Sequence, residues 1–215
     1  AKHFQNKKVI VITKANESES NTKYAQGGVA IALNKRYDSF KKHIEDTLAA
    51  GDGLCNKKVV EFVIKEGPQR LQELIKWGAN FDKKKSGHYD LGKEGGHTTS
   101  RIVHHKDNTG LEMERTLLKQ IHKTSNIEIL SHHFAIDLLT EHHIKNRTPI
   151  TIRKKNISCY GVYSLNLNNN SIDKISARIT LLATGGVGQV YKNTTNPIIA
   201  TGDGVAMAYR AKAII

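Results

Sequence analysis

Residues 179–186 read Ile-Thr-Leu-Leu-Ala-Thr-Gly-Gly, an apolar run that ends in a glycine pair. The apolar run is typical of a buried strand, and we expect it to complete a strand over 172–183. Glycines at the carboxyl end of a strand lie at the sheet edge where α/β folds bind ligands. A β-branched run at Val9–Ile12 predicts another buried strand near the start of the chain. These runs, with helical patterns between them, predict an α/β fold.

Helical spacing of apolar residues occurs in four segments between residues 38 and 123. Asp38 is the expected N-cap of the first helix. Gly67-Pro68 is expected to separate the second helix from the third, because proline cannot donate to the preceding turn. The apolar residues expected to face the core are Phe40, Ile44, Leu48, Val59, Val60, Val63, Ile64, Leu71, Leu74, Ile75, Met113, Leu117 and Ile121.

From Ile127 onward the chain changes to period two, which is typical of half-exposed strands. We therefore expect a β-rich insertion between about residues 127 and 180, with a turn at Asn168-Asn169-Asn170. The expected strands are 127–130, 134–139, 150–154, 159–167 and 172–183. Gly202-Asp203-Gly204 then opens a helix of small residues. No repeat or flexible linker is visible that would divide the chain into independent domains.

The composition is that of a globular protein: 215 residues, 38% hydrophobic and 25% charged, with a formal net charge of +13. The lysines are scattered and lack interleaved aromatic residues, so we expect no nucleic-acid binding. A non-enzymatic basic binding module remains a rival hypothesis. Two cysteines far apart give no disulfide framework. With no apolar run of membrane-spanning length and no signal-peptide pattern, a cytoplasmic location is expected.

Two glycine-containing segments could approach a flat ligand closely, although each alone also fits an ordinary loop. They are S-E-S-N-T-K-Y-A-Q-G-G-V-A at 18–30 and L-L-A-T-G-G at 181–186. The other motifs in the series are H-I-E-D-T at 43–47, E-G-G-H at 94–97, D-N-T-G at 107–110, F-A-I-D-L at 134–138, Y-K-N-T-T-N-P at 191–197 and T-G-D-G at 201–204. Taken in order, they resemble the flavoprotein family of succinate dehydrogenases, fumarate reductases and L-aspartate oxidases, across nearly the whole chain.

The resemblance implies an FAD-binding domain that is Rossmann-like, of the glutathione-reductase type. By resemblance, Lys14 lies near the adenosine ribose, Phe134 and Ala135 lie near adenine, and Asp203 contacts the flavin from a helix start. The residues implied to wrap the flavin and pyrophosphate side are Asn21, Thr22, Lys23, Tyr24, Ala25, Gln26, Gly27 and Gly28. A second FAD-contacting turn is implied at Ala183, Thr184 and Gly185.

Glu94 helps to choose among the members of this family. Relatives that handle succinate or fumarate generally carry an aromatic residue before this Gly-Gly, whereas an acid resembles the members that oxidise aspartate. A carboxylate can pair with the α-ammonium group of L-aspartate, and it would repel succinate. The resemblance then implies oxidation of L-aspartate to iminoaspartate for quinolinate and NAD synthesis, with oxygen or fumarate as electron acceptor. His97 is an expected neighbour of the substrate.

Two alternatives stay open beside this interpretation. The first is a flavoprotein subunit of succinate dehydrogenase or fumarate reductase. The second treats Glu94 as a plain surface charge on a loop. Adjacent histidines such as His132-His133 lack the spacing of a zinc site, so no metal is expected.

The resemblance also predicts that residues 1–215 are an incomplete FAD-binding domain. The family's G-x-G-x-x-G turn would precede Val9, and its capping domain and arginine proton shuttle would follow Ile215. The chain on its own is therefore expected to be inactive, with weak or no FAD binding.

Overall fold

The computed structural model describes residues 1, 5–33, 36–141 and 157–215, which form two compact units. Unit 1 contains residues 1–21 and 124–215, and unit 2 contains residues 22–123. Unit 2 is thus inserted into the sequence of unit 1, and the chain passes between the units after Asn21 and after Lys123. Neither point is marked by a linker in the sequence.

Unit 1 contains a parallel pair of strands, β1 (Val9–Ile12) and β5 (Ile127–Leu130). Val9 lies opposite Ile127, and the register continues to Ile12 opposite Leu130. The strand predicted from the β-branched run at Val9–Ile12 is confirmed. The segment at 127–130 is also a strand as predicted, but its partner is β1 rather than the antiparallel strands that follow it.

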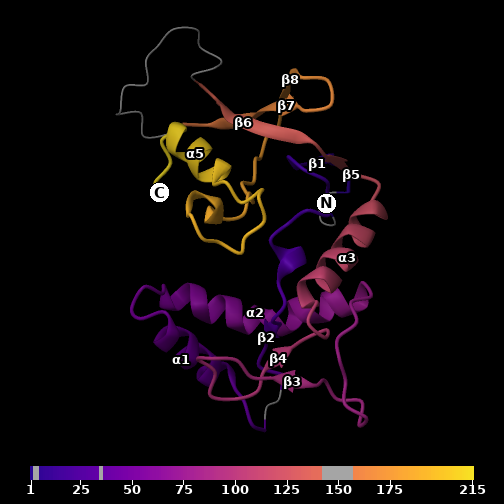
Figure 1. Ribbon diagram of the computed structural model, residues 1–215, viewed down its shortest axis with the longest axis vertical. Coiled ribbons are helices and arrows are strands. Elements are labelled where there is room, and N and C mark those ends of the chain that lie inside the picture. Colours follow the sequence, from indigo (N-terminus) through magenta and orange to yellow (C-terminus); the bar gives the residue numbers. More distant parts are fainter. Residues whose placement is uncertain (2–4, 34–35, 142–156) are drawn as a thin grey trace. The chain divides into compact units, whose positions relative to one another are not determined.

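The other sheet of unit 1 is antiparallel, in the order β6 (His133–Thr140), β7 (Cys159–Asn166) and β8 (Ser171–Ser176). The polar turn after β7 includes Asn170 at a φ of +58°, a left-handed conformation that asparagine tolerates. Helix α5 (Asp203–Arg210) lies beside β6 (Figure 1), where Arg210 Nε donates to Asp137 Oδ2 at 3.1 Å. The strand expected at 150–154 lies outside the described residues.

The prediction of a strand through residues 179–183 is wrong. Strand β8 ends at Ser176, and residues 178–183 form no strand in the described part of the chain. Ile179 and Leu181 are each 85% exposed. Apolar composition alone favoured a buried strand, but a strand also needs a hydrogen-bonding neighbour, and β8 pairs only with β7.

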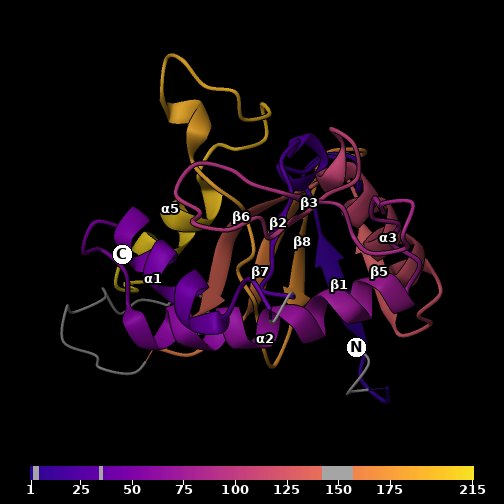
Figure 2. The same ribbon diagram turned by 90° about the horizontal axis from the view of Figure 1, so that it is seen from below.

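The described residues of unit 2 form three α-helices, a short 3-10 helix and a small antiparallel sheet. The helices are α1 (Phe40–Ala50), α2 (Lys57–Lys76) and α3 (Thr109–His122). The sheet has the order β2 (Val29–Ala30), β4 (Ile102–Val103), β3 (Leu91–Gly92). Its buried core consists of Ile31, Leu71, Ala79, Phe81 and Val103. Figure 2 shows α2 as the long helix of this unit, with α1 packed against it.

A single helix, α2, replaces the two helices predicted on either side of Gly67-Pro68. Proline inside a helix costs about 3 kcal/mol because it removes a backbone donor and crowds the preceding turn. Burial of Ile64 before the proline and Leu71 after it offsets that cost, since both side chains are less than 10% exposed. Gly67 faces Ile31, whose Cδ1 would lie 3.0 Å from a Cβ at that position.

The N-cap and the buried face of α1 also differ from the prediction. Ser39, not Asp38, caps the helix, because its side chain accepts from the Lys42 amide at 3.2 Å. The buried residues of α1 are His43 and Asp46, whereas the predicted core residue Phe40 is 40% exposed. The polar face is buried because Asp46 accepts a hydrogen bond from the buried guanidinium of Arg101.

The buried face of α3 is likewise more polar than predicted. Leu117, expected in the core, is 37% exposed, while Thr109, Gly110 and Thr116 are buried. Met113 packs against the core as predicted. The start of α3 is buried because it lies against the 3-10 helix η1 (Thr22–Tyr24).

None of the helices in the described part of the chain combines the length and apolar character needed to cross a membrane. Both cysteines, Cys55 and Cys159, are free thiols.

Candidate functional site

Lys14 anchors a polar cluster in unit 1. It follows β1, and its Nζ lies 2.5 Å from both Thr201 Oγ1 and Asp203 Oδ2. Thr201 Oγ1 also donates to Asp203 Oδ1 at 2.8 Å. Asp203 begins α5, where the helix dipole favours a carboxylate. The cluster offers a cation, a hydroxyl and a carboxylate together, a set suited to hydrogen-bonding a polyhydroxyl group.

The predicted turn at Thr184 and Gly185 meets both Asn21 and Gly204 within the same unit. Gly185 has a φ of +71°, and a Cβ there would lie 3.0 Å from Asn21 Nδ2. A Cβ on Gly204 would lie only 1.8 Å from Thr184 Oγ1. The two glycines are therefore required for this close approach. Asn21 Oδ1 is a buried acceptor without a hydrogen-bond partner in the part of the chain that the structure describes, so it is available to a ligand.

A hollow of about 290 Å³ lies between β6 and α5. It is lined by Phe134–Asp137, Asp203, Ala206 and Arg210, so it contains the predicted residue Ala135 and shares Asp203 with the Lys14 cluster. Ligand pockets usually measure roughly 300–1,000 Å³, so this hollow is large enough for part of a ligand rather than all of a large one.

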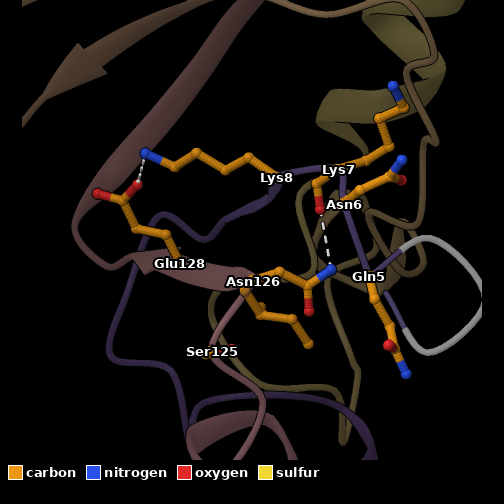
Figure 3. A pocket seen from close by; sticks show the side chains of 8 residues that line it. Gln5, Asn6, Lys7, Lys8, Ser125, Asn126 and Glu128 are labelled. Atoms are coloured by element: carbon orange, nitrogen blue, oxygen red, sulfur yellow. Dashed lines mark hydrogen bonds and ion pairs between the residues drawn. The ribbon is translucent and has the colours of Figure 1, made fainter.

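A larger hollow of about 500 Å³ lies at the amino-terminal ends of β1 and β5 (Figure 3). Its walls are polar and carry none of the predicted site residues. Lys8 reaches Glu128 at 2.5 Å, and Asn126 Nδ2 donates to the Lys7 carbonyl at 2.8 Å, so these groups already satisfy one another. Since α/β folds bind ligands at the carboxyl ends of their strands, we do not assign the site here.

In unit 2, the predicted residues Thr22 to Gly28 form a loop that is held by the start of α3. Thr109 Oγ1 donates to the Gly27 carbonyl at 2.6 Å, and the Gly110 amide donates to the Ala25 carbonyl at 2.9 Å. A Cβ on Gly110 would lie 1.7 Å from the Thr22 carbonyl oxygen. The sequence showed the D-N-T-G motif at 107–110 but not its role, which is to fix this loop.

Glu94 contacts the same loop. A Cβ on Gly27 would lie 2.7 Å from Glu94 Oε1, so the absence of a side chain at Gly27 makes room for the carboxylate. Gly28 is equally constrained, because a Cβ there would lie 2.3 Å from Ile102 Cγ2. Two motifs 66 residues apart in sequence are thereby brought together, with an exposed acid beside the paired glycines.

His97, the predicted neighbour of Glu94, packs edge-on against His43 of α1, with ring centroids 6.2 Å apart. The Nδ1 atoms of both rings are buried without hydrogen-bond partners among the described residues. Burial and the nearby Arg101 guanidinium lower the pKa of His43, which favours the neutral imidazole. No group of three or more metal-ligating side chains occurs within residues 1, 5–33, 36–141 and 157–215.

Sequence reasoning missed Arg101, which is completely buried. Its Nε and Nη2 donate to the two oxygens of Asp38 at 2.9 and 2.8 Å, and its Nη1 donates to Asp46 Oδ2 at 2.6 Å. Burial alone would raise the pKa of both carboxyls, but hydrogen bonds from Arg101 and from backbone amides outweigh it and lower both pKa values. The H-I-E-D-T motif at 43–47 was the available signal, since it places an acid on the buried face of α1.

The arrangement is that of a cofactor-binding domain: a polar cluster follows β1, a glycine turn at Gly185 meets Asn21, and a separate acid stands beside a second glycine pair. The chain belongs to the FAD binding domain family, whose sequence pattern matches residues 1–215. This confirms the resemblance to FAD-dependent flavoproteins and identifies FAD as the cofactor.

Several relatives that this chain resembles are named L-aspartate oxidase. The chain is 48% identical to L-aspartate oxidase 2-b, chloroplastic, of Nicotiana tabacum over 207 residues, which are 96% of this chain and 30% of that protein. It is 39% identical to the L-aspartate oxidase of Vibrio cholerae, covering 95% of this chain and 37% of that one. The chain thus spans about a third of the length of these relatives.

Solved structures of related flavoproteins have the same fold. A mutant of E. coli quinol fumarate reductase FrdA superposes with a TM-score of 0.88 at 30% identity, covering 98% of this chain and 33% of that one. Sdh1 of Mycobacterium smegmatis in its apo form gives a TM-score of 0.85, also at 30% identity, and covers 97% of this chain and 35% of that one.

Proposed function

We propose that this chain is part of an FAD-dependent oxidase that converts L-aspartate to iminoaspartate, a step in quinolinate and NAD synthesis. The names of the relatives support this proposal, since proteins called L-aspartate oxidase match nearly the whole chain at 39–48% identity. The observation that carries it is the Glu94 carboxylate, which stands exposed beside the Gly27–Gly28 pair.

The residues of unit 1 fit FAD through several independent features. Lys14, which is held by Asp203, offers hydrogen bonds to the ribose hydroxyls, and Ala135 lines a hollow that suits the adenine ring. Asn21 supplies a buried acceptor that no described residue satisfies, and Gly185 gives a backbone turn free of side-chain bulk. We infer that the parallel strands β1 and β5 belong to a Rossmann-like core. When bound, FAD would accept a hydride, which carries both electrons removed from the substrate, and the protein's task is to hold and orient the cofactor and the substrate.

The substrate preference follows from the charge on Glu94. L-Aspartate carries an α-ammonium group that succinate lacks, so a carboxylate attracts the first and repels the second. His97 adds an imidazole ring to the same loop, and the pKa of its neighbour His43 is lowered by burial and by the Arg101 guanidinium. We assign Glu94 to pairing with the substrate ammonium and His97 to its immediate surroundings.

The alternative is a succinate dehydrogenase or fumarate reductase subunit, a class to which the solved neighbours belong. The acid at Glu94 favours the aspartate-specific interpretation. We propose oxygen or fumarate as the electron acceptor. We also propose a cytoplasmic location; the plant relatives are chloroplastic by name, so cell fractionation tests this point.

Glu94→Gln in the full-length, FAD-loaded protein tests the function. Loss of a charge-assisted hydrogen bond costs about 1.5–3 kcal/mol, so KM for L-aspartate should rise about 10- to 150-fold. Succinate should inhibit the variant as well as or better than the original protein, because the repulsion is gone. Glu45→Gln, on the exposed side of α1, is the matched control. It should change neither KM for L-aspartate nor the inhibition by succinate. An unchanged KM for aspartate in Glu94→Gln would show that Glu94 is only a surface charge.

A further inference from the structure

The loop that carries Glu94 is closed at its base. It leaves β3 after Gly92 and returns at Arg101, whose amide donates to the Gly92 carbonyl at 3.0 Å. Inside the loop, the His97 amide donates to the Glu94 carbonyl at 3.2 Å, which forms a tight turn. The backbone of Glu94 is therefore linked directly to the segment 97–101.

That segment is anchored to α1 by one carboxylate. Asp46 Oδ2 accepts from the Thr98 amide and from Thr98 Oγ1, both at 2.9 Å. The same oxygen accepts from Arg101 Nη1 at 2.6 Å. The Asp46 side chain is only 7% exposed, so these are strong, charge-assisted bonds in a site with little water.

Arg101 fixes Asp46 in turn, because its guanidinium is held rigidly on the other side. Two parallel hydrogen bonds join it to Asp38, immediately before α1, and Nη2 also donates to Thr99 Oγ1 at 2.8 Å. A bidentate arginine has little freedom to rotate. The start of α1 and the Glu94 loop are therefore tied together through Arg101.

We propose that Asp46 and Arg101 are positioning residues for Glu94, and that the Thr98 hydroxyl is the contact through which they act. This inference rests on the proposed pairing of Glu94 with the substrate ammonium. A carboxylate that must meet an ammonium group within hydrogen-bond reach loses affinity when its loop loosens. Succinate has no ammonium group, so its binding does not depend on where Glu94 is held.

The test uses Thr98→Val and Thr98→Ser in the full-length, FAD-loaded protein. Valine keeps the shape and the backbone amide but removes the hydroxyl, whereas serine keeps the hydroxyl. Thr98→Val should raise KM for L-aspartate about 5- to 10-fold, the size of one ordinary hydrogen bond and less than the effect of Glu94→Gln, because the Glu94 carboxylate itself remains. The inhibition constant of succinate and the FAD content should stay within about twofold, and Thr98→Ser should restore KM.

A double-mutant cycle with Glu94→Gln separates positioning from a general structural role. In the Glu94→Gln background, Thr98→Val should leave KM for aspartate unchanged, because the carboxylate it positions is gone. Equal effects of Thr98→Val in both backgrounds, or equal weakening of succinate and aspartate, would overturn the positioning role alone. If the original protein neither binds nor oxidises aspartate, the proposed function fails and the positioning role fails with it.

Discussion

Replacing Arg101 with methionine should destabilise unit 2 by about 3–5 kcal/mol, the typical cost of removing one partner from a buried ion pair. The side chain is fully buried and donates to both oxygens of Asp38 and to Asp46. Methionine fills similar volume, so the cost comes mainly from two buried carboxylates that lose their cation. Arg70→Met is the matched control: Arg70 is 53% exposed on α2 and should cost less than about 1 kcal/mol.

The effect of Arg101→Met should depend on pH in a characteristic direction. In the original protein the pKa values of Asp38 and Asp46 are lowered, mainly because hydrogen bonds from Arg101 and backbone amides outweigh burial. Their contribution to stability is therefore present above the unfolded-state pKa, about 4, and is lost as pH falls through the folded-state values. In the variant, burial without a cation raises both pKa values, so protonation relieves the cost. The stability difference between variant and original should shrink as pH falls from 7 toward 4.

Urea unfolding followed by the fluorescence of Trp77, the single tryptophan, measures this difference at each pH. Trp77 lies at the end of α2, so it reports on unit 2. A difference below about 1 kcal/mol at neutral pH, or one that does not shrink in acid, would refute the reasoning that a buried charge network holds this unit.

Two further substitutions test the glycine turns and the loop contacts. Gly204→Ala places a Cβ 1.8 Å from Thr184 Oγ1, so in the full-length protein it should weaken FAD binding about tenfold or more by overpacking. Gly186→Ala adds a Cβ in open space and should not weaken FAD binding. A flavin titration that gives both variants the same affinity for FAD would contradict this. Thr109→Val removes the donor to the Gly27 carbonyl and should lower the free energy of unfolding in urea by about 1–3 kcal/mol. Thr109→Ser should restore stability, and a valine variant as stable as the original protein would contradict the prediction.

The elements that local chemistry alone decides were predictable from the sequence. The β-branched run at Val9–Ile12 and the polar turn at Asn168–Asn170 both carry their signal in a few residues. Elements decided by distant partners were not. α2 continues through Pro68 because the core covers both sides of it, and residues 179–183 lack the neighbouring strand that their composition favours.

The candidate site likewise contains residues that the sequence reveals and residues that only the fold reveals. Glycine pairs and the acid at Glu94 stand out in the sequence. A missing Cβ allows close approach of the backbone, and a carboxylate can bind a cation, whatever the rest of the fold. Arg101 did not stand out, because its importance comes from Asp38 and Asp46, 63 and 55 residues away, and a buried arginine looks like any surface arginine in sequence. The contact of Gly27 with Glu94 likewise required the fold.

The most direct test of the proposed function is reduction of the bound flavin, without oxygen, by each candidate substrate. The full-length, FAD-loaded protein would be mixed anaerobically with L-aspartate or with succinate, and the visible absorbance of the oxidised flavin would be followed. We predict that L-aspartate bleaches the flavin and that succinate does not. Bleaching by succinate with none by L-aspartate would contradict the assignment of Glu94 and the proposed function together.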